Sequence, residues 1–317
     1  MFTKIKNYLV IMVLAGMSLM ALVFFIVALI YPTLPNVSHL QQYRPKEPLQ
    51  VFSKEGLLIA EFGEERRNHV LIKHVPQKMI NAILAIEDRR FFEHPGIDII
   101  GVLRAALKNI SGQGHEGAST ITMQVARNFF LSSERTFKRK INEILLAIKI
   151  ENSLSKEEIL ELYINQIYLG QRAFGFSAAA NTYFNKSLAE LNLAESALLA
   201  GLPKAPSRYN PLVNPELAIQ RQQAVLRSML RHGYIDNATY QIALEEAIDL
   251  RDSVSKRELK ADYVAEMVRQ ELYAEFGEGI YTSGLKVFTT IKKRNQIYAN
   301  RAVQNNFIHY MIRNGLT

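Results

Sequence analysis

The sequence has no cysteine, and this absence excludes disulfide-stapled folds, thiolate zinc sites and cysteine nucleophiles. It also lacks internal repeats and low-complexity tracts, and its 48% hydrophobic and 21% charged residues are typical of a globular chain. Acidic residues are outnumbered, 30 Asp+Glu against 38 Lys+Arg, which leaves a net charge of +8. Such an excess indicates a polyanionic partner: nucleic acid, anionic lipid or a phosphorylated substrate.

Charge is missing altogether from the run Leu9 to Tyr31. At about 1.5 Å per residue the run spans roughly 34 Å and can cross a hydrocarbon core of about 30 Å. It is longer than the apolar core of a cleaved signal peptide, and a buried core helix rarely stays uncharged for this length. Lys4 and Lys6 precede the run, so the positive-inside rule predicts a single-pass inner-membrane protein with a cytoplasmic N-terminus. The remaining residues would lie on the periplasmic or extracellular face, which argues against nucleic acid as a partner.

The rest of the chain divides by composition and periodicity. Prolines between Pro32 and Pro48 predict an extended spacer, and Val51 to Phe62 is typical of a β-hairpin. From Pro76 the apolar spacing is helical; the predicted helices are 77–90, 97–110, 118–131, 136–151, 155–169, 174–184, 188–201, 214–232, 236–247 and 263–276, and a strand is predicted at 285–291. The predicted domains are 1–8 (cytoplasmic N-terminus), 9–31 (transmembrane anchor), 32–75 (spacer and β-hairpin), 76–250 (main helical domain) and 251–317 (linker and start of a following domain).

Four segments of the helical region carry polar residues that a plain helical core does not need. Taken one at a time, each has a structural explanation. Residues 87–96 can be a solvated helix end, and 117–128 a helix capped by Ser119 or Thr120. Residues 135–143 can be a basic surface, and 156–170 an amphipathic helix packed on the core. The functional alternative for the second segment is an anion-binding helix N-terminus.

Together, in this order, the segments resemble the signature motifs of the peptidoglycan glycosyltransferases, the polymerase family of class A penicillin-binding proteins and monofunctional transglycosylases. The matches are 87–96 (Glu-Asp-x-x-Phe-x-x-His-x-Gly), 117–128, 139–143 (Arg-Lys-x-x-Glu), 156–170 and 175–186, within a resemblance that covers about 75–250. The chain departs from the family at Met123, where a glutamine is common, and at Arg127, where a lysine is common. Asn142 stands where some relatives carry another cation, so we do not count it as a phosphate ligand.

The resemblance implies a mainly α, lysozyme-like glycosyltransferase domain at 76–250, with a small β component and one transmembrane helix before it. The implied reaction polymerises lipid II into β-1,4-linked glycan strands, with inversion and release of undecaprenyl diphosphate. By motif position Glu87 is the general base, and Glu143 is a second catalytic carboxylate that holds cations or binds a divalent metal such as Mg²⁺ or Mn²⁺. The candidate substrate contacts are Asp88, Phe91, His94, Ser119, Thr120, Gln124, Arg127, Asn128, Arg135, Arg139 and Lys140. The implied partners are lipid II, the growing strand, membrane lipids and other cell-wall synthesis proteins.

Two features outside the motifs carry expectations of their own. Ile97 to Leu103 is apolar enough to lie in the membrane interface, although an ordinary core helix explains it equally well. In class A penicillin-binding proteins a serine transpeptidase follows, marked by Ser-x-x-Lys and later by Ser-x-Asn and Lys-Thr-Gly. The Ser-x-x-Lys matches at Ser153, Ser253 and Ser283 are not followed by those later motifs. We therefore expect a truncated chain without transpeptidase activity.

Two other functions stay open on the sequence. A lysozyme-like lytic enzyme would cleave glycan strands with a glutamate acid, but it would not need the basic run 135–140 to bind a diphosphate. A membrane-anchored scaffold for cell-wall or division proteins would need no catalytic glutamate. Product analysis separates a lytic enzyme from a polymerase, and a Glu87 variant separates a scaffold from both.

Overall fold

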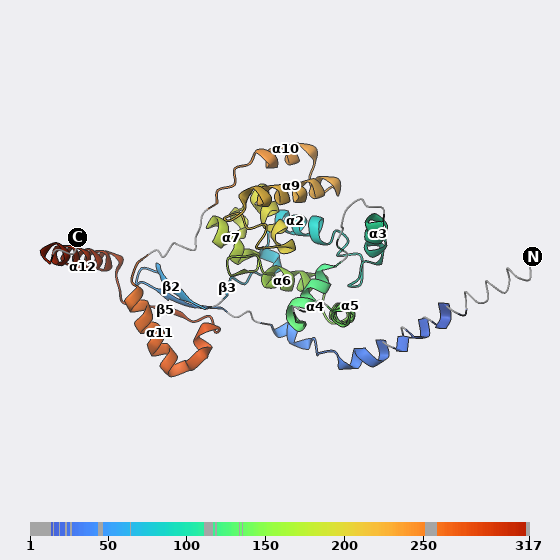
Figure 1. The fold of residues 1–317 in the computed structure, drawn as a ribbon, viewed down its shortest axis with the longest axis horizontal. Helices are drawn as coiled ribbons and strands as arrows, with labels where there is room; N and C mark the ends of the chain where they lie inside the picture. Colours follow the sequence, from blue (N-terminus) through green and yellow to red (C-terminus); the bar gives the residue numbers. More distant parts are fainter. Residues whose placement is uncertain are drawn as a thin grey trace, which may run out of the picture. The chain divides into compact units, whose positions relative to one another are not determined.

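The computed structural model of the protein describes residues 14–314 except 15, 19, 23, 26, 44–46, 64, 111–116, 118, 133, 135 and 251–258. In this part of the chain helices dominate and two small sheets accompany them (Figure 1). The prediction of a mainly α fold with a small β component is confirmed. The chain forms two compact units, Met1–Tyr43 with Glu87–Tyr163, and Arg44–Ile86 with Ile164–Thr317.

The first unit is built on helices that follow the predicted apolar spacing. They are α3 (Ile99–Ile110), α4 (Ile121–Phe130), α5 (Phe137–Glu151) and the first part of α6 (Lys156–Gln166). Thr120 and Thr136 cap α4 and α5, since their hydroxyls accept the backbone N–H groups of Met123 at 3.2 Å and Arg139 at 3.1 Å. Helices α4 and α5 pack side by side (Figure 1) through apolar faces that leave Leu146 fully buried.

The N-terminal segment of the first unit begins with a helix long and apolar enough to cross a membrane, Gly16–Thr33, and none of its described residues is buried. The stretch after it is not the extended spacer that its prolines predict. The apolar stretch ends in a 3-10 turn, η1 (Tyr31–Thr33), and a second one, η2 (Ser38–Gln42), follows it. Leu34, Val37 and Leu40 recur every third residue and are buried, which explains why the stretch folds onto the protein.

The second unit contains a group of helices that enclose a core rich in alanine and leucine. They are α2 (Gln77–Glu87, whose last residue is assigned to the first unit), α7 (Phe176–Phe184), α8 (Leu193–Gly201), α9 (Pro215–Arg231) and α10 (Asn237–Glu245), with 3-10 turns η3 (Ile72–His74), η4 (Leu188–Glu190) and η5 (Leu202–Lys204). Helix α8 is the central helix of this group and packs most extensively on α9. Asn192 and Glu195 form a capping box that fixes its start.

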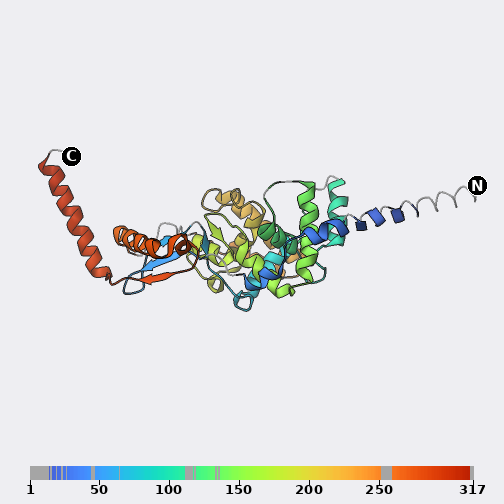
Figure 2. The ribbon, with the colours of Figure 1, turned by 90° about the horizontal axis from the view of Figure 1, so that it is seen from below.

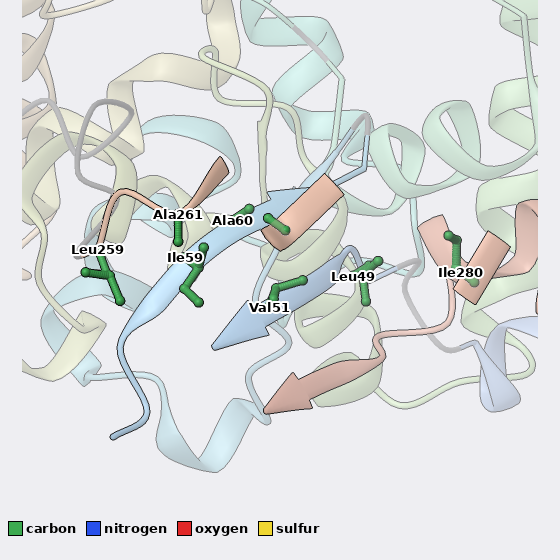
Figure 3. Close-up of a cluster of buried hydrophobic side chains, with 8 residues drawn as sticks. Leu49, Val51, Ile59, Ala60, Leu259, Ala261 and Ile280 are labelled. Atoms are coloured by element: carbon green, nitrogen blue, oxygen red, sulfur yellow. The ribbon is translucent and has the colours of Figure 1, made fainter. Parts of the chain in front are cut away.

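A three-stranded sheet joins distant parts of the second unit. Strands β1 (Leu49–Phe52) and β2 (Leu58–Phe62) pair antiparallel, which confirms the predicted hairpin. Strand β5 (Lys286–Phe288) lies parallel to β1 on its other side, a pairing that no local pattern indicates. Helix α11 (Asp262–Phe276) and η7 (Gly277–Tyr281) complete the core with the sheet, where Val51, Ile59 and Ile280 are fully buried (Figure 3).

A second sheet and a long helix complete the second unit. Strands β3 (Arg66–Arg67) and β4 (Ala173–Phe174) form a short parallel sheet. The guanidinium of Arg67 lies over the ring of Phe174, 4.6 Å from its centroid. Helix α12 (Lys293–Arg313) is the last element described and forms a single long helix (Figure 2).

Candidate active site

Glu87, the expected general base, is the last residue of α2. Its side chain is half-buried, and Gln124 Nε2 donates a hydrogen bond to Glu87 Oε2 at 2.7 Å. Gln124 is buried in the first turns of α4, so its amide is held in place and orients the carboxylate. The last turn of α2 is fixed in the same way, because Ser228 Oγ of α9 donates to the carbonyl of Ala85 at 2.6 Å.

Asp88 is the next residue, but its carboxylate points into the protein. Asp88 Oδ2 accepts the backbone N–H of Ile121 at 3.0 Å, and His94 Nε2 lies 3.0 Å from both oxygens. The buried charge lies at the N-terminus of α4, where the helix dipole stabilises an anion. Phe91 is fully buried beside this pair. Asp88, Phe91 and His94, expected to contact substrate, therefore contact the protein itself and fix the segment that follows Glu87.

Glu143 organises a cation cluster (Arg139, Lys140 and Glu143) on one face of α5. Arg139 Nη1 donates to Glu143 Oε2 at 2.9 Å, and Lys140 Nζ donates to Glu143 Oε1 at 2.7 Å. The Glu143 side chain is only 1% exposed, whereas Lys140 is 41% exposed. Lys140 Nζ also donates to Ser119 Oγ at 3.0 Å, just before α4. One buried carboxylate thus holds two cations, and the cluster keeps an excess positive charge at a partly exposed position.

The other expected contacts lie on α4, at its N-terminal cap, or outside the described residues. Arg127 is three residues after Gln124 on α4, is half-buried, and makes no ion pair within the described part of the chain. Asn128 is exposed, and Thr120 caps the helix while donating to the carbonyl of Gly96 at 2.6 Å. Arg135 lies outside the described residues. Helix α4 and the residues just before it therefore carry five of the eleven candidate contacts: Ser119, Thr120, Gln124, Arg127 and Asn128.

A family comparison agrees with this arrangement. The sequence profile of the family described as Transglycosylase matches residues 55–230, more than half of the chain. The chain belongs to the transglycosylase family.

Relatives in this transglycosylase family include penicillin-binding protein 1A of Neisseria meningitidis (strain MC58), 52% identical over 290 residues that cover 91% of this chain and 36% of that protein. Penicillin-binding protein 1A of Pseudomonas aeruginosa (strain PAO1) is 49% identical over 285 residues, 90% of this chain and 35% of that one. The crystal structure of penicillin-binding protein 1A from Haemophilus influenzae matches with a TM-score of 0.51 and 37% identity, covering 86% of this chain and 31% of that chain. The chain thus spans about a third of the length of these curated relatives.

The residues around Glu143 do not fit a protein-bound divalent metal. Both carboxylate oxygens already accept charged donors, from Arg139 and Lys140. No group of three His, Asp or Glu side chains suited to an ion is found among the described residues. Divalent ions prefer several oxygen ligands, and the two cations beside Glu143 repel them. Of the two roles expected for Glu143, holding cations is the one that this geometry offers.

Sequence reasoning missed two side chains next to the candidate site. Thr122 and Glu151 hydrogen-bond to each other across α4 and α5, with Thr122 Oγ1 2.5 Å from Glu151 Oε1. Thr122 lies inside the second motif without a role of its own there, and Glu151 lies outside every motif. A threonine and a glutamate near helix ends carry no local signal, because their partners are set by helix packing.

Proposed function

We propose that this chain is a membrane-anchored peptidoglycan glycosyltransferase that polymerises lipid II into β-1,4-linked glycan strands. The observation that carries this proposal is the position of the short segment 119–124. At one end Ser119 accepts a hydrogen bond from Lys140, and at the other Gln124 donates to Glu87. A candidate base and a candidate diphosphate clamp are thus held by the same six-residue stretch of this transglycosylase-family chain.

The proposed reaction is an inverting displacement at the anomeric carbon of the growing strand. The 4-hydroxyl oxygen of an incoming lipid II attacks this carbon, and the bond from carbon to the diphosphate oxygen breaks. Glu87 takes the proton of the attacking hydroxyl, so undecaprenyl diphosphate leaves as the anion. Inversion requires the base and the leaving group on opposite faces of the sugar, as in inverting glycosidases, where a water molecule takes the place of the hydroxyl.

The leaving diphosphate needs charge neutralisation more than it needs a proton. Arg139 and Lys140 supply positive charge, and Glu143 keeps both side chains in a fixed orientation. Arg127 adds a guanidinium, which suits bidentate contact with phosphate oxygens, and Arg135 is a further candidate. Ser119, Thr120, Gln124 and Asn128 remain candidates for sugar and phosphate contacts. The divalent metal requirement stays a prediction with no protein ligand assigned to it.

The substrate's lipid tail calls for a membrane-facing surface beside the site. Gly16–Thr33 can anchor the first unit, with the N-terminus in the cytoplasm and the enzyme on the opposite face of the inner membrane. Helix α3 adds an apolar surface, because Ile99, Ile100 and Leu103 are 68%, 59% and 60% exposed. These exposures contradict the core-helix alternative for this stretch and support contact with the membrane interface.

In the natural protein we propose that this glycosyltransferase precedes a penicillin-binding transpeptidase domain. The names of the relatives, and the third of their length that the chain spans, support this extension. The chain itself carries no transpeptidase signature. Other cell-wall synthesis proteins are its proposed partners.

The test is turnover of labelled lipid II by the detergent-solubilised protein with a divalent metal, with the products resolved on a gel. We expect a ladder of polymer and release of undecaprenyl diphosphate. Shortening of preformed strands with 1,6-anhydro ends would instead identify a lytic enzyme. Absence of both reactions from the folded protein would favour the scaffold.

A further inference from the structure

An ion pair behind the candidate base connects the two segments that position it. Lys156, the first residue of α6, donates from Nζ to Glu151 Oε1 at 2.7 Å. The side chains of Lys156 and Glu151 are 19% and 9% exposed. A mostly buried pair needs further hydrogen bonds to offset the loss of water, and both members of this pair make them.

The partners of Lys156 lie in the segment that follows Glu87. Its Nζ donates to the carbonyl of His94 at 2.7 Å and lies 4.5 Å from the centroid of the Phe91 ring. The ring of His94 is in turn bound to Asp88, the residue next to Glu87. Lys156 therefore sets the position of this segment through a backbone carbonyl and an aromatic face.

The partner of Glu151 lies on α4. Glu151 Oε1 accepts from Thr122 Oγ1 at 2.5 Å, and Thr122 is fully buried. Thr122 and Gln124 are two residues apart, so at about 100° per residue they lie on opposite faces of the helix. Glu151 therefore holds α4 on one face while the other face presents Gln124 to Glu87.

We propose that Glu151 and Lys156 are positioning residues for the general base. Glu87 ends α2 directly before the segment that Lys156 holds, and Gln124 lies on α4, which Glu151 holds through Thr122. Both sides of the Glu87–Gln124 hydrogen bond are therefore connected to this one ion pair. Neither Glu151 nor Lys156 contacts the reacting atoms in this account. Their role rests on the proposed glycosyltransferase function only in that Glu87 is the base.

The experiment compares Glu151→Gln, Lys156→Met, Lys156→Arg and the double variant E151Q/K156M in lipid II polymerisation. We expect each neutralising variant to lower kcat about 10- to 100-fold with the KM for lipid II changed less than about threefold, because misplacement by about 1 Å costs a rate factor of this size. The double variant should be little slower than either single one, since both remove the same pair. Lys156→Arg keeps the charge and should recover part of kcat. Glu157→Gln and Lys54→Met, both at exposed positions, should match the parent.

Hydrogen exchange supplies a readout that does not depend on turnover. Amides in 88–98 and 119–125 should exchange at least about tenfold faster in the two single variants, while other segments stay at parental rates. If the parent and all variants fail to polymerise lipid II, the proposed function fails, and exchange alone decides the positioning role. Folded variants with parental kcat, or with unchanged exchange in both segments, would overturn the positioning role of Glu151 and Lys156.

Thr122→Val covers the case in which loss of a charge prevents folding. It removes only the hydroxyl that donates to Glu151 and leaves the ion pair in place. We expect a severalfold lower kcat, an unchanged KM and faster exchange at 119–125. A folded Thr122→Val protein with parental kcat and exchange would contradict the proposal.

Discussion

Glu87 and Asp88 are neighbours in the chain with different surroundings, and these surroundings separate their roles. Helix α2 ends at Glu87, whose half-buried carboxylate meets a neutral amide from Gln124. Asp88 is buried against His94 and the first N–H of α4. A buried carboxylate fixed by a backbone N–H and a histidine ring cannot move toward a substrate, whereas a half-buried one that is oriented by a neutral amide can still accept a proton.

Asp88→Asn tests the supporting role of Asp88. The amide keeps the size of the side chain but loses the charge at the α4 N-terminus. Its NH₂ group can only donate, so it cannot accept a hydrogen bond from His94 or from the backbone N–H that it faces. We expect the free energy of unfolding to fall by about 2–4 kcal/mol, the usual range for breaking a buried charged contact. Denaturant titration measures this, with the exposed Glu157→Gln as control. A change below about 0.5 kcal/mol would mean that Asp88 does not support the site.

Glu143→Gln tests the cation cluster. Without the carboxylate, Arg139 and Lys140 repel each other and lose their fixed orientation. We expect a loss of about 1–3 kcal/mol in stability and a fall in kcat of at least about tenfold. Added salt should partly restore stability by screening the two cations, which thermal unfolding at two ionic strengths can detect. Parental activity in the folded variant would show that the cluster is not needed for turnover.

At the scale of elements, the turn that ends the first motif, before α3, is packed tightly against α5. Gly96 has φ +89°, and a Cβ there would lie 3.0 Å from Glu151 Cγ and 3.1 Å from the carbonyl oxygen of Ala147. Only glycine fits both this left-handed conformation and this close approach. The glycine in the family's first motif is therefore explained by packing on the end of α5.

Gly96→Ala should destabilise the protein by about 2–3 kcal/mol, from backbone strain and from contact with α5. Gly56→Ala is the matched control, because Gly56 has φ +83° but a Cβ added there would meet no atom within 4 Å. Gly56→Ala should therefore lower the free energy of unfolding only through backbone strain, by about 1 kcal/mol. Equal losses in the two variants, measured by chemical denaturation, would rule out the contact with α5.

A lysine on α5 helps to hold the stretch after the apolar helix, beside the buried Leu34, Val37 and Leu40. Lys149 Nζ donates to the carbonyls of Leu34 at 3.3 Å and Pro35 at 3.0 Å, and lies 5.6 Å from the centroid of the Tyr31 ring. Lys149→Met should weaken this attachment by about 1 kcal/mol. Limited proteolysis should then cut within residues 34–43 severalfold faster, while the exposed Lys54→Met should cleave like the parent. Unchanged cleavage would show that the buried Leu34, Val37 and Leu40 are enough to hold this stretch on the protein without Lys149.

At the scale of the whole molecule, the sequence predicts what depends on local pattern. Apolar spacing, capping residues and the hairpin turn place most of the helices and the β1–β2 pair within a few residues of their observed ends. The predicted helix 188–201 is an exception, because the structure divides it into η4 and α8, which begins at Leu193 after its cap Asn192. The partner of β5 is beyond such reasoning, because it pairs with β1 from more than 200 residues away. The bond from Thr122 to Glu151, and the exposure of α3, depend on which faces pack together. Periodicity marks a face as apolar but does not identify what covers it.

The central claim is that Glu87 is the base of a lipid II polymerase, and Glu87→Gln tests it most directly. Parent and variant are incubated side by side with labelled lipid II, after circular dichroism and thermal unfolding have shown that both are folded. The account predicts polymer from the parent and none from the variant, because an amide cannot accept the hydroxyl proton. Polymer from both proteins would contradict the account and place the base elsewhere in the molecule.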